Sequence, residues 1–507
     1  LQGGERKTQT VWLNYGQDKG GLDWAREPLC PTLKPEVYEK AEAFQWFTAD
    51  AAEGPLERLI QEGLDGPNNF FAKREVIDEY GWRNFGDLFA DHETLYQHPD
   101  EKPLISHYNN QYDAISGFAR QFARTGDKRW FELMDDLARH VADIDIYHTE
   151  EDRNEYNNGL FWHTDHYLPA STATHRTFSK FNDRSSTEGQ TGGGPAEEHC
   201  YTTGLLYHYF LTGNLSSRRA VLDLASWITN LHEGSGALLE QLLRIKRYDM
   251  PRIRSLLSAG KPTSHVYSFN RGTGNYLNAL LDAHILEPDA GWLKRAESVV
   301  YGTVNPHDRI AERQLLIAET GWSYLVLITA ISRLLCIKEE SGSFDLAYQY
   351  VANSLRHYSR WMLANEQTFL SRPAELEFAN DTWAAQDIRK AMIFFQAPLW
   401  DEERSDQYVT RANEFLDYVS KTLEKSSELT LTRVQVILIQ NYGPHKARAP
   451  IAPKELDASK TEQVAFNNPC LTWPSLARRI VGRLTRGLIG FRLKRERLWL
   501  STRLDRT

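Results

Sequence analysis

One stretch of the sequence concentrates side chains that exchange protons. Residues 161–167 read FWHTDHY and residues 173–177 read ATHRT, so three histidines, one aspartate and one arginine lie within fourteen positions. Histidine is the side chain whose charge changes most readily near neutral pH. We therefore expect this stretch to carry catalysis and substrate binding. The catalytic candidates are His163, Asp165, His166 and Tyr167, and the substrate-binding candidates are Trp162, His175 and Arg176.

A transition-metal site is the alternative for the same residues, because imidazole and carboxylate groups are common metal ligands. Bringing His163, Asp165 and His166 together would require a loop, and no HExxH or equivalent motif supports such a site. We predict no bound transition metal. Loops rich in Asp, Asn and Glu could present oxygen atoms to Ca²⁺, but none has the spacing of a defined calcium loop, so calcium stays open as a cofactor.

Two further clusters place an aromatic ring beside an amide or a charge. Residues 78–84 read DEYGWRN and residues 106–110 read SHYNN. This combination suits a hydroxylated ring, which stacks on one face and forms hydrogen bonds at its edge. The substrate-binding candidates in these clusters are Tyr80, Trp82, Arg83, His107, Asn109 and Asn110.

Similar polar and aromatic clusters recur where successive helices are expected to begin. They occupy residues 109–113, 197–201, 270–276, 319–322 and 380–383. N-capping accounts for single Asn, Asp or Thr residues, but not for the repeated Tyr, Trp, His and Arg beside them. We expect these helix starts to share one mouth, whose positive helix ends favour anionic groups. Its candidates are the catalytic Glu197 and Tyr201 and the substrate-binding Tyr112, His199, Arg271, Tyr276, Trp322 and Trp383.

The segment TWAAQDIRK at residues 382–390 has two interpretations. Trp383, Gln386 and Arg389 can share one face of a helix. That face would either form a wall of the cleft or pack in the core with a salt bridge.

The elements that position these residues are predicted to be helical hairpins. Long apolar-periodic segments alternate with tight turns, such as Thr125-Gly126-Asp127 and Thr212-Gly213-Asn214. About six such pairs predict an all-α fold, an (α/α)6 toroid with a short N-terminal β-like remnant. We expect residues 1–34 to be a remnant or linker, residues 35–430 the catalytic toroid, and residues 431–507 a C-terminal extension with a basic amphipathic helix.

Charge is distributed unevenly along the 507 residues. The formal net charge is −9, which gives no global attraction to nucleic acid, yet residues 478–506 carry ten Lys or Arg against two acidic residues. This tail would suit an anionic membrane surface, an acidic polysaccharide or the acidic body of the protein itself. The sequence contains no run of 18 apolar residues, so we predict no membrane span. We expect a secreted or periplasmic protein whose signal sequence, and even an upstream domain, precedes Leu1.

Several segments joined in order resemble the exo-acting rhamnogalacturonan lyases and their bacterial relatives. They are DEYGWRNFGDLFADHE from Asp78, SHYNNQYD from Ser106, DIDIYHTEEDRNEYNNGLFWHTDHY from Asp143, ATHRTFS from Ala173 and TWAAQDIRK from Thr382. The resemblance implies an α/α toroid, an upstream β-rich domain and a pectin-like acidic polysaccharide as substrate. This chain has only the β-like run Thr8 to Tyr15 in place of that domain, which leaves the polysaccharide open.

The leading hypothesis is a polysaccharide lyase acting on uronic acid residues. β-Elimination requires a group that neutralises the carboxylate, a base for the C5 proton and an acid for the leaving oxygen. In this sequence Arg176 or Arg271 with Asn109 or Asn110 could hold the carboxylate, His166 or His163 could act as base, and Tyr112, Tyr167 or Tyr201 as acid.

Two other functions fit the same residues. A glycoside hydrolase on the same toroid would use Asp165 and Glu197 as paired carboxylates. A non-catalytic protein would bind the glycan unchanged.

Overall fold

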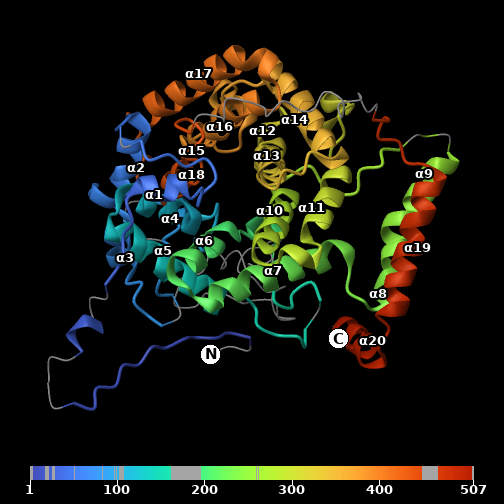
Figure 1. Ribbon diagram of the computed structural model, residues 1–507, viewed down its shortest axis with the longest axis horizontal. Coiled ribbons are helices and arrows are strands. Elements are labelled where there is room, and N and C mark those ends of the chain that lie inside the picture. The colour runs from blue at the N-terminus through green and yellow to red at the C-terminus, as the bar shows by residue number, and fades with distance from the viewer. Residues whose placement is uncertain are drawn as a thin grey trace.

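The computed structural model describes residues 4–16, 22–25, 29–50, 52–82, 84–95, 97–98, 100–101, 108–152, 154–160, 196–258, 260, 262–447 and 466–504. These residues form helices and connecting turns (Figure 1), which confirms the all-α class. Within these ranges the β pairing is limited to two isolated bridges, Ile146 with Leu160 and Thr263 with Cys470. The predicted β-like run from Thr8 to Tyr15 is extended and forms no strand.

One set of helices begins at or close to the polar clusters, apart from its last member. It comprises α4 (Ala114–Thr125), α6 (Thr203–Thr212), α10 (Arg271–Leu286), α13 (Tyr324–Glu340), α15 (Thr382–Gln386) with α16 (Ile388–Gln396), and α18 (Thr432–Gln440). Consecutive members of this set pack against one another, and α18 packs against α4, so the contacts return to the first helix.

A second set of helices packs on the first. It comprises α5 (Lys128–His140), α7 (Leu215–Glu233), α11 (Trp292–Tyr301), α14 (Leu346–Asn365) and α17 (Ser405–Leu423), each paired with the helix of the first set that precedes it. The partner of α18 comes from the other end of the chain, since α2 (Pro55–Asp65) packs on it. Residues 36–63 therefore do not form one helical hairpin, because α1 (Pro35–Lys40) packs on α4.

The turns inside the hairpins have the chemistry expected from the sequence. Gly126 and Gly213 end α4 and α6 with φ of 68° and 71°, a left-handed conformation that glycine adopts without steric cost. The next residues, Asp127 and Asn214, cap α5 and α7 by accepting hydrogen bonds from backbone N–H groups. Each TGD or TGN sequence thus ends one helix and begins the next.

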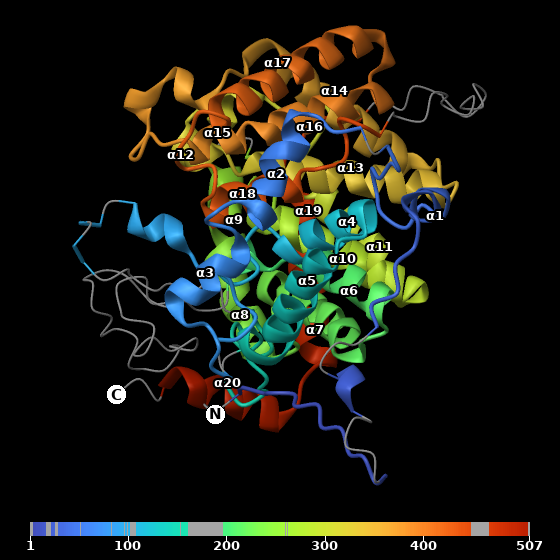
Figure 2. The same ribbon diagram turned by 90° about the vertical axis from the view of Figure 1, so that its left-hand side faces the viewer.

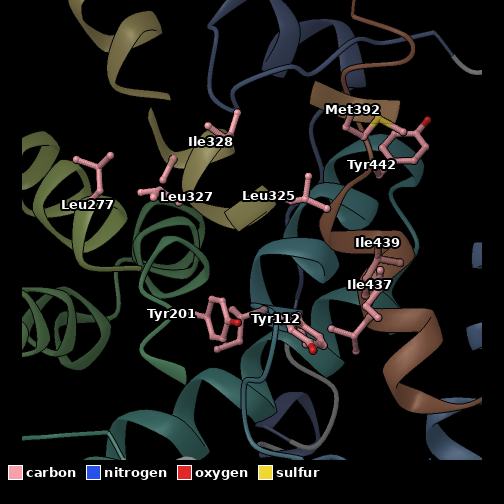
Figure 3. Packing of buried hydrophobic residues seen from close by; sticks show 14 of the residues in the cluster. Tyr112, Tyr201, Leu277, Leu325, Leu327, Ile328, Met392, Ile437, Ile439 and Tyr442 are labelled. Carbon is pink, nitrogen blue, oxygen red and sulfur yellow. The ribbon is translucent and has the colours of Figure 1, made fainter. Parts of the chain in front are cut away.

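One described segment is long and apolar enough to cross a membrane. It spans Ala318–Glu340, which includes α12 (Ala318–Gly321) and α13, and 72% of its most apolar window is buried in the protein. Helix α13 contacts α10, α14 and α16, so it is apolar around most of its circumference. We interpret it as a core helix. Figure 3 shows the surrounding core, in which Tyr112 and Tyr201 lie side by side.

Four helices form an arm beside the helical body (Figure 1). Helix α19 (Trp473–Ile489) packs on α8 (Leu238–Arg244) and α9 (Met250–Leu257), and α20 (Leu493–Leu504) packs on α8. Arg483 pairs with Asp249 at 2.9 Å and Arg486 with Glu233 at 2.6 Å. Part of the basic tail is therefore neutralised by acidic residues of the same protein.

Candidate functional site

Tyr112 lies at the centre of a group of aromatic and cationic side chains. The guanidinium groups of Arg389 and Arg271 lie 5.1 Å and 5.8 Å from the centre of its ring. The rings of Trp322 and Tyr201 lie at 6.0 Å and 6.4 Å, both in edge-on geometry. With His199 and Gln386, these residues make up what we call the arginine–tyrosine cluster. It draws together the starts of α4, α6, α10, α13, α15 and α16.

Arg271 is the first residue of α10, and the preceding segment fixes it in place. Asn270 caps the helix by accepting a hydrogen bond from Thr273 N. Gly272 lets the turn at 197–199 approach α10, since a Cβ there would lie 2.7 Å from Glu197 Cγ. His199 Nε2 lies 3.1 Å from Arg271 Nη2, and because a guanidinium only donates, this imidazole nitrogen accepts. The turn before α6 therefore orients Arg271.

Arg389 is buried, and it has no counter-ion among the residues that the structure describes. Its side chain is on α16, only 4% of the residue is exposed, and its Nε donates to Gln386 Oε1 at 2.7 Å. Gln386 in turn donates to the Tyr112 hydroxyl at 3.2 Å. No carboxylate of the described ranges forms an ion pair with Arg389, while burial lowers its pKa and nearby Arg271 lowers it further. A buried cation without a carboxylate is costly, which makes this guanidinium a strong candidate for binding an anion.

The charge of Arg271 is only weakly balanced. Glu198 lies 3.7 Å away, and its side chain is 46% exposed. Exposed ion pairs at such a distance contribute little because water screens them. The cluster thus holds two guanidinium groups against one distant carboxylate.

Several donors in the cluster are unsatisfied. Arg271 Nη1, Arg389 Nη2 and the Tyr201 hydroxyl are buried and form no hydrogen bond of good geometry in the described part of the chain, although Tyr201 lies close to Arg271 and Asn275. Burial raises the pKa of Tyr201 to about 12, although Arg271 acts in the opposite direction. Tyr201 therefore keeps its proton at neutral pH. These N–H and O–H groups could be satisfied by the oxygen atoms of a ligand.

The loop that carries Tyr112 is held in a strained conformation. Asn109, Tyr112 and Asp113 have φ between 53° and 57°, which is uncommon for residues other than glycine. Asp113 accepts hydrogen bonds from Ser116 N on α4 and Gly204 N on α6, and burial raises its pKa to about 6. Asn110 donates to Asp113 at 3.2 Å. The carboxylate of Asp113 thus has a structural role in joining two helix starts.

A second buried network supports the same loop. Asp87 accepts a hydrogen bond from Asn109 N at 2.7 Å, and His140 Nε2 lies 3.5 Å from Asp87 and 3.2 Å from Asp145. Burial lowers the pKa of His140, but Asp145 and Asp87 outweigh burial and raise it to about 9. Asn109 and Asn110 therefore serve the architecture of the loop.

The structure brings together Tyr112, His199, Tyr201, Arg271 and Trp322 of the predicted site residues. Other candidates make their contacts elsewhere. Tyr80 and Trp82 are exposed on the turn after α3 (Phe70–Ile77), where the Tyr80 hydroxyl donates to Glu75. Trp383 donates to Phe378 O at 3.0 Å.

Two further candidates lie around His232. Tyr276 is fully buried, stacks on His232 at 4.6 Å and donates to Glu233. The carboxylate of Glu197 pairs with His232 at 2.6 Å. The remaining candidates lie outside the described residues: Arg83, His107, Trp162, His163, Asp165, His166, Tyr167, His175 and Arg176.

The sequence suggested Arg389 and Gln386 only as members of one helix face. In the structure Arg389 belongs to the cluster and forms no salt bridge with a described residue, whereas the next residue, Lys390, forms the buried salt bridges, with Glu366 at 3.0 Å and Asp387 at 2.9 Å. Periodicity places a residue on a face but does not reveal which cation finds a carboxylate.

A polar cavity adjoins the cluster. It has a volume of about 120 Å³ and runs between helices of the first set, from Tyr201 and Asn275 to Arg120, Arg333 and Asn441. Arg333 is neutralised by Asp282 at 2.5 Å. Among the described residues, no three His, Cys, Asp or Glu side chains are arranged to hold a metal ion.

Comparison with known proteins gives little further information. No protein-family model matches the chain. A segment of 143 residues is 26% identical to the uncharacterized protein YetA of Bacillus subtilis (strain 168), and the alignment covers 27% of this chain. The chain spans only 16% of the length of that relative, whose name assigns no activity.

Proposed function

We propose that this protein is a polysaccharide lyase that cleaves a uronic-acid-containing, pectin-like polysaccharide by β-elimination. The observation that carries the proposal is the buried guanidinium of Arg389, which lies beside Arg271 and the phenols of Tyr112 and Tyr201 and forms no ion pair with a carboxylate of the described ranges. A uronate carboxylate would supply the missing negative charge and accept hydrogen bonds from both arginines.

The reaction requires the same charge arrangement. Neutralising the uronate carboxylate makes the C5 proton more acidic, because negative charge develops on the carboxylate as the proton leaves. The C4–C5 double bond then forms and the C4–O bond breaks. Tyr201 is the proposed acid that protonates the leaving oxygen, since its pKa of about 12 keeps the phenol protonated. His166 or His163 remains the proposed base.

The fold proposed with this activity is an (α/α)6 toroid. The contacts that support it are those of consecutive helices of the first set, with α18 against α4, and the packing of α5, α7, α11, α14, α17 and α2 each on one helix of that set. In such a toroid the arginine–tyrosine cluster would line the mouth, where helix N-termini add to the positive potential.

The hydrolase alternative needs two carboxylates flanking the scissile bond. Glu197 is one of its candidates, and its carboxylate is already paired with His232. The described residues therefore favour the lyase hypothesis over the hydrolase hypothesis. A protein that only binds glycans would use the same arginines without product formation.

The test is to incubate the purified protein with polygalacturonate, rhamnogalacturonan and other acidic polysaccharides, with and without EDTA. A lyase produces unsaturated uronides that absorb in the ultraviolet, together with new reducing ends. The proposal predicts this product and its loss in Arg389→Met, while Arg219→Met, which removes an exposed arginine of α7, serves as the control. Reducing ends without absorbance would indicate a hydrolase, and saturable binding without product would indicate a glycan-binding protein.

A further inference from the structure

The turn between α19 and α20 exposes apolar side chains at the surface. Leu488, Ile489, Phe491 and Leu493 fall within six consecutive positions and are between 45% and 75% exposed. Apolar surface of this density on a soluble protein marks a site of interaction. With the basic residues Arg492, Lys494 and Arg497, these residues form what we call the C-terminal corner.

The corner is held in place by hydrogen bonds. Arg495 donates to Gly490 O at 2.7 Å and Arg492 donates to Phe491 O at 2.8 Å, both within the turn. Glu496 accepts from Leu238 N at 2.7 Å and Leu239 N at 3.0 Å, which fixes α20 to the start of α8. The apolar side chains are therefore presented outward by a docked turn.

The charge of the corner is positive and unopposed. Glu496 is the only acidic residue between Trp473 and Leu504, and its carboxylate is used to cap α8. Arg492, Lys494 and Arg497 form no ion pair within the described part of the chain, in contrast to Arg483 and Arg486. Apolar side chains bordered by free cations match an anionic lipid surface.

A second exposed apolar segment lies at the same end of the molecule. The N-terminal segment and α20 both lie at the lower end in Figures 1 and 2. Trp12 and Trp24 of this segment are each 51% exposed, and their rings are 4.6 Å apart. Tryptophan is the side chain that most favours the boundary between lipid and water.

We propose that the C-terminal corner binds the surface of an anionic lipid bilayer. Leu488, Ile489 and Phe491 enter the boundary between headgroups and acyl chains, and Arg492, Lys494 and Arg497 contact lipid phosphates. An acidic polysaccharide would match the charge but not the branched aliphatic side chains, because sugars stack on flat aromatic rings. The inference does not depend on the proposed lyase activity.

The experiment is flotation of the purified protein with vesicles. One set contains phosphatidylcholine alone, and the other contains phosphatidylcholine with phosphatidylglycerol, each at low and high salt. We expect binding to the anionic vesicles, weakened by high salt. Arg492→Gln with Lys494→Gln is expected to weaken binding by more than tenfold, since each cation near such a surface contributes roughly fivefold. Leu488→Ser with Ile489→Ser is expected to weaken it by a similar factor.

The matched control is Leu215→Ser with Leu346→Ser, which removes two exposed leucines at the starts of α7 and α14. It should bind vesicles like the unaltered protein. Because all four leucine and isoleucine positions are exposed, circular dichroism and thermal unfolding should be unchanged. Equal binding to neutral and anionic vesicles, loss of binding in the control, or binding to soluble polygalacturonate with none to vesicles would overturn the proposal.

Discussion

Two neighbouring buried cations on α16 differ in whether a carboxylate neutralises them. Lys390 is 1% exposed and lies within 3.0 Å of both Glu366 and Asp387, and it also donates to Gln367 O. Arg389 is 4% exposed and lies against Tyr112 and Gln386, with no carboxylate partner among the described residues. The chain therefore supplies carboxylates where a buried cation holds the fold together.

The same contrast extends to other buried cations. Arg333 is neutralised by Asp282, and His140 by Asp145 and Asp87. At the arginine–tyrosine cluster, in contrast, two guanidinium groups lie together, and the ion pair that they form within the described ranges is that of Arg271 with the half-exposed Glu198. A charge arrangement that costs stability indicates a site at which a ligand completes the charge balance.

The largest expected effect is on stability, at Lys390. Replacing it in Lys390→Met leaves Glu366 and Asp387 buried without their cation, so the free energy of unfolding should fall by about 3–5 kcal/mol. Urea denaturation measures this change. A loss below about 1 kcal/mol would show that the two carboxylates do not need this partner.

At Arg389 the effect should be on activity instead. Arg389→Met should lower kcat/KM on a uronide about 10²–10³-fold, as the loss of a charge-stabilising group does, while the free energy of unfolding stays the same or rises. Arg389→Lys keeps the charge but loses the planar fork, so it should restore only part of the activity. Large destabilisation of Arg389→Met would assign Arg389 a structural role.

His140 extends the comparison to pH. Its pKa of about 9 exceeds the value of about 6.5 of an unfolded histidine, so the folded state binds the proton more tightly. This stabilisation is fully present below pH 6.5 and is lost as pH rises from 6.5 to 9, up to about 3 kcal/mol. Urea denaturation at several pH values should show this slope in the unaltered protein and in Arg389→Met. His140→Gln should flatten it.

Removing the hydroxyl of Tyr201 should lower catalytic activity without lowering the stability of the fold. Tyr201→Phe should lower kcat about 10²-fold, as expected when a general acid is removed. Tyr276→Phe is the matched control, because Tyr276 is also buried but donates to Glu233 away from the cluster. The proposed role of Tyr201 fails if both variants lose activity equally.

The smallest effect is expected at Glu198. Its side chain is half exposed and 3.7 Å from Arg271, so Glu198→Gln should change the free energy of unfolding by less than about 1 kcal/mol. Removing its negative charge should also lower KM for an acidic substrate slightly. A higher KM would mean that Glu198 contacts the substrate itself.

Much of the helical architecture follows from local sequence signals. The tight turns Thr125-Gly126-Asp127 and Thr212-Gly213-Asn214 and the polar clusters at five helix starts were predicted from residue type and spacing, and the structure adds the caps at Asp127 and Asn214. These signals are local, because a cap or a left-handed glycine depends on the next few residues.

Long-range pairing was beyond such reasoning. The partnership of α2 with α18 joins residues more than 360 positions apart, as in the hydrogen bond from Gln435 to Leu59 O. The approach of Arg389 to Tyr112 is equally remote in sequence. Residue type predicted that Tyr112 and Arg271 bind a ligand, but only the three-dimensional packing distinguishes Arg389 from Lys390.

The contact of α18 with α4 and α2 also affects how the chain folds during its synthesis on the ribosome. Lys73 and Asp91 bond to Thr432, so the helices near them obtain their last partners only after a further 341 residues beyond Asp91 have been synthesised. Until then, α4 and α2 expose the apolar surfaces that α18 will cover, and bringing α18 to them costs loop-closure entropy. In a nascent chain on the ribosome, these helices would therefore stay incompletely packed until α18 is made. Any truncation before Thr432 should leave a protein prone to aggregation.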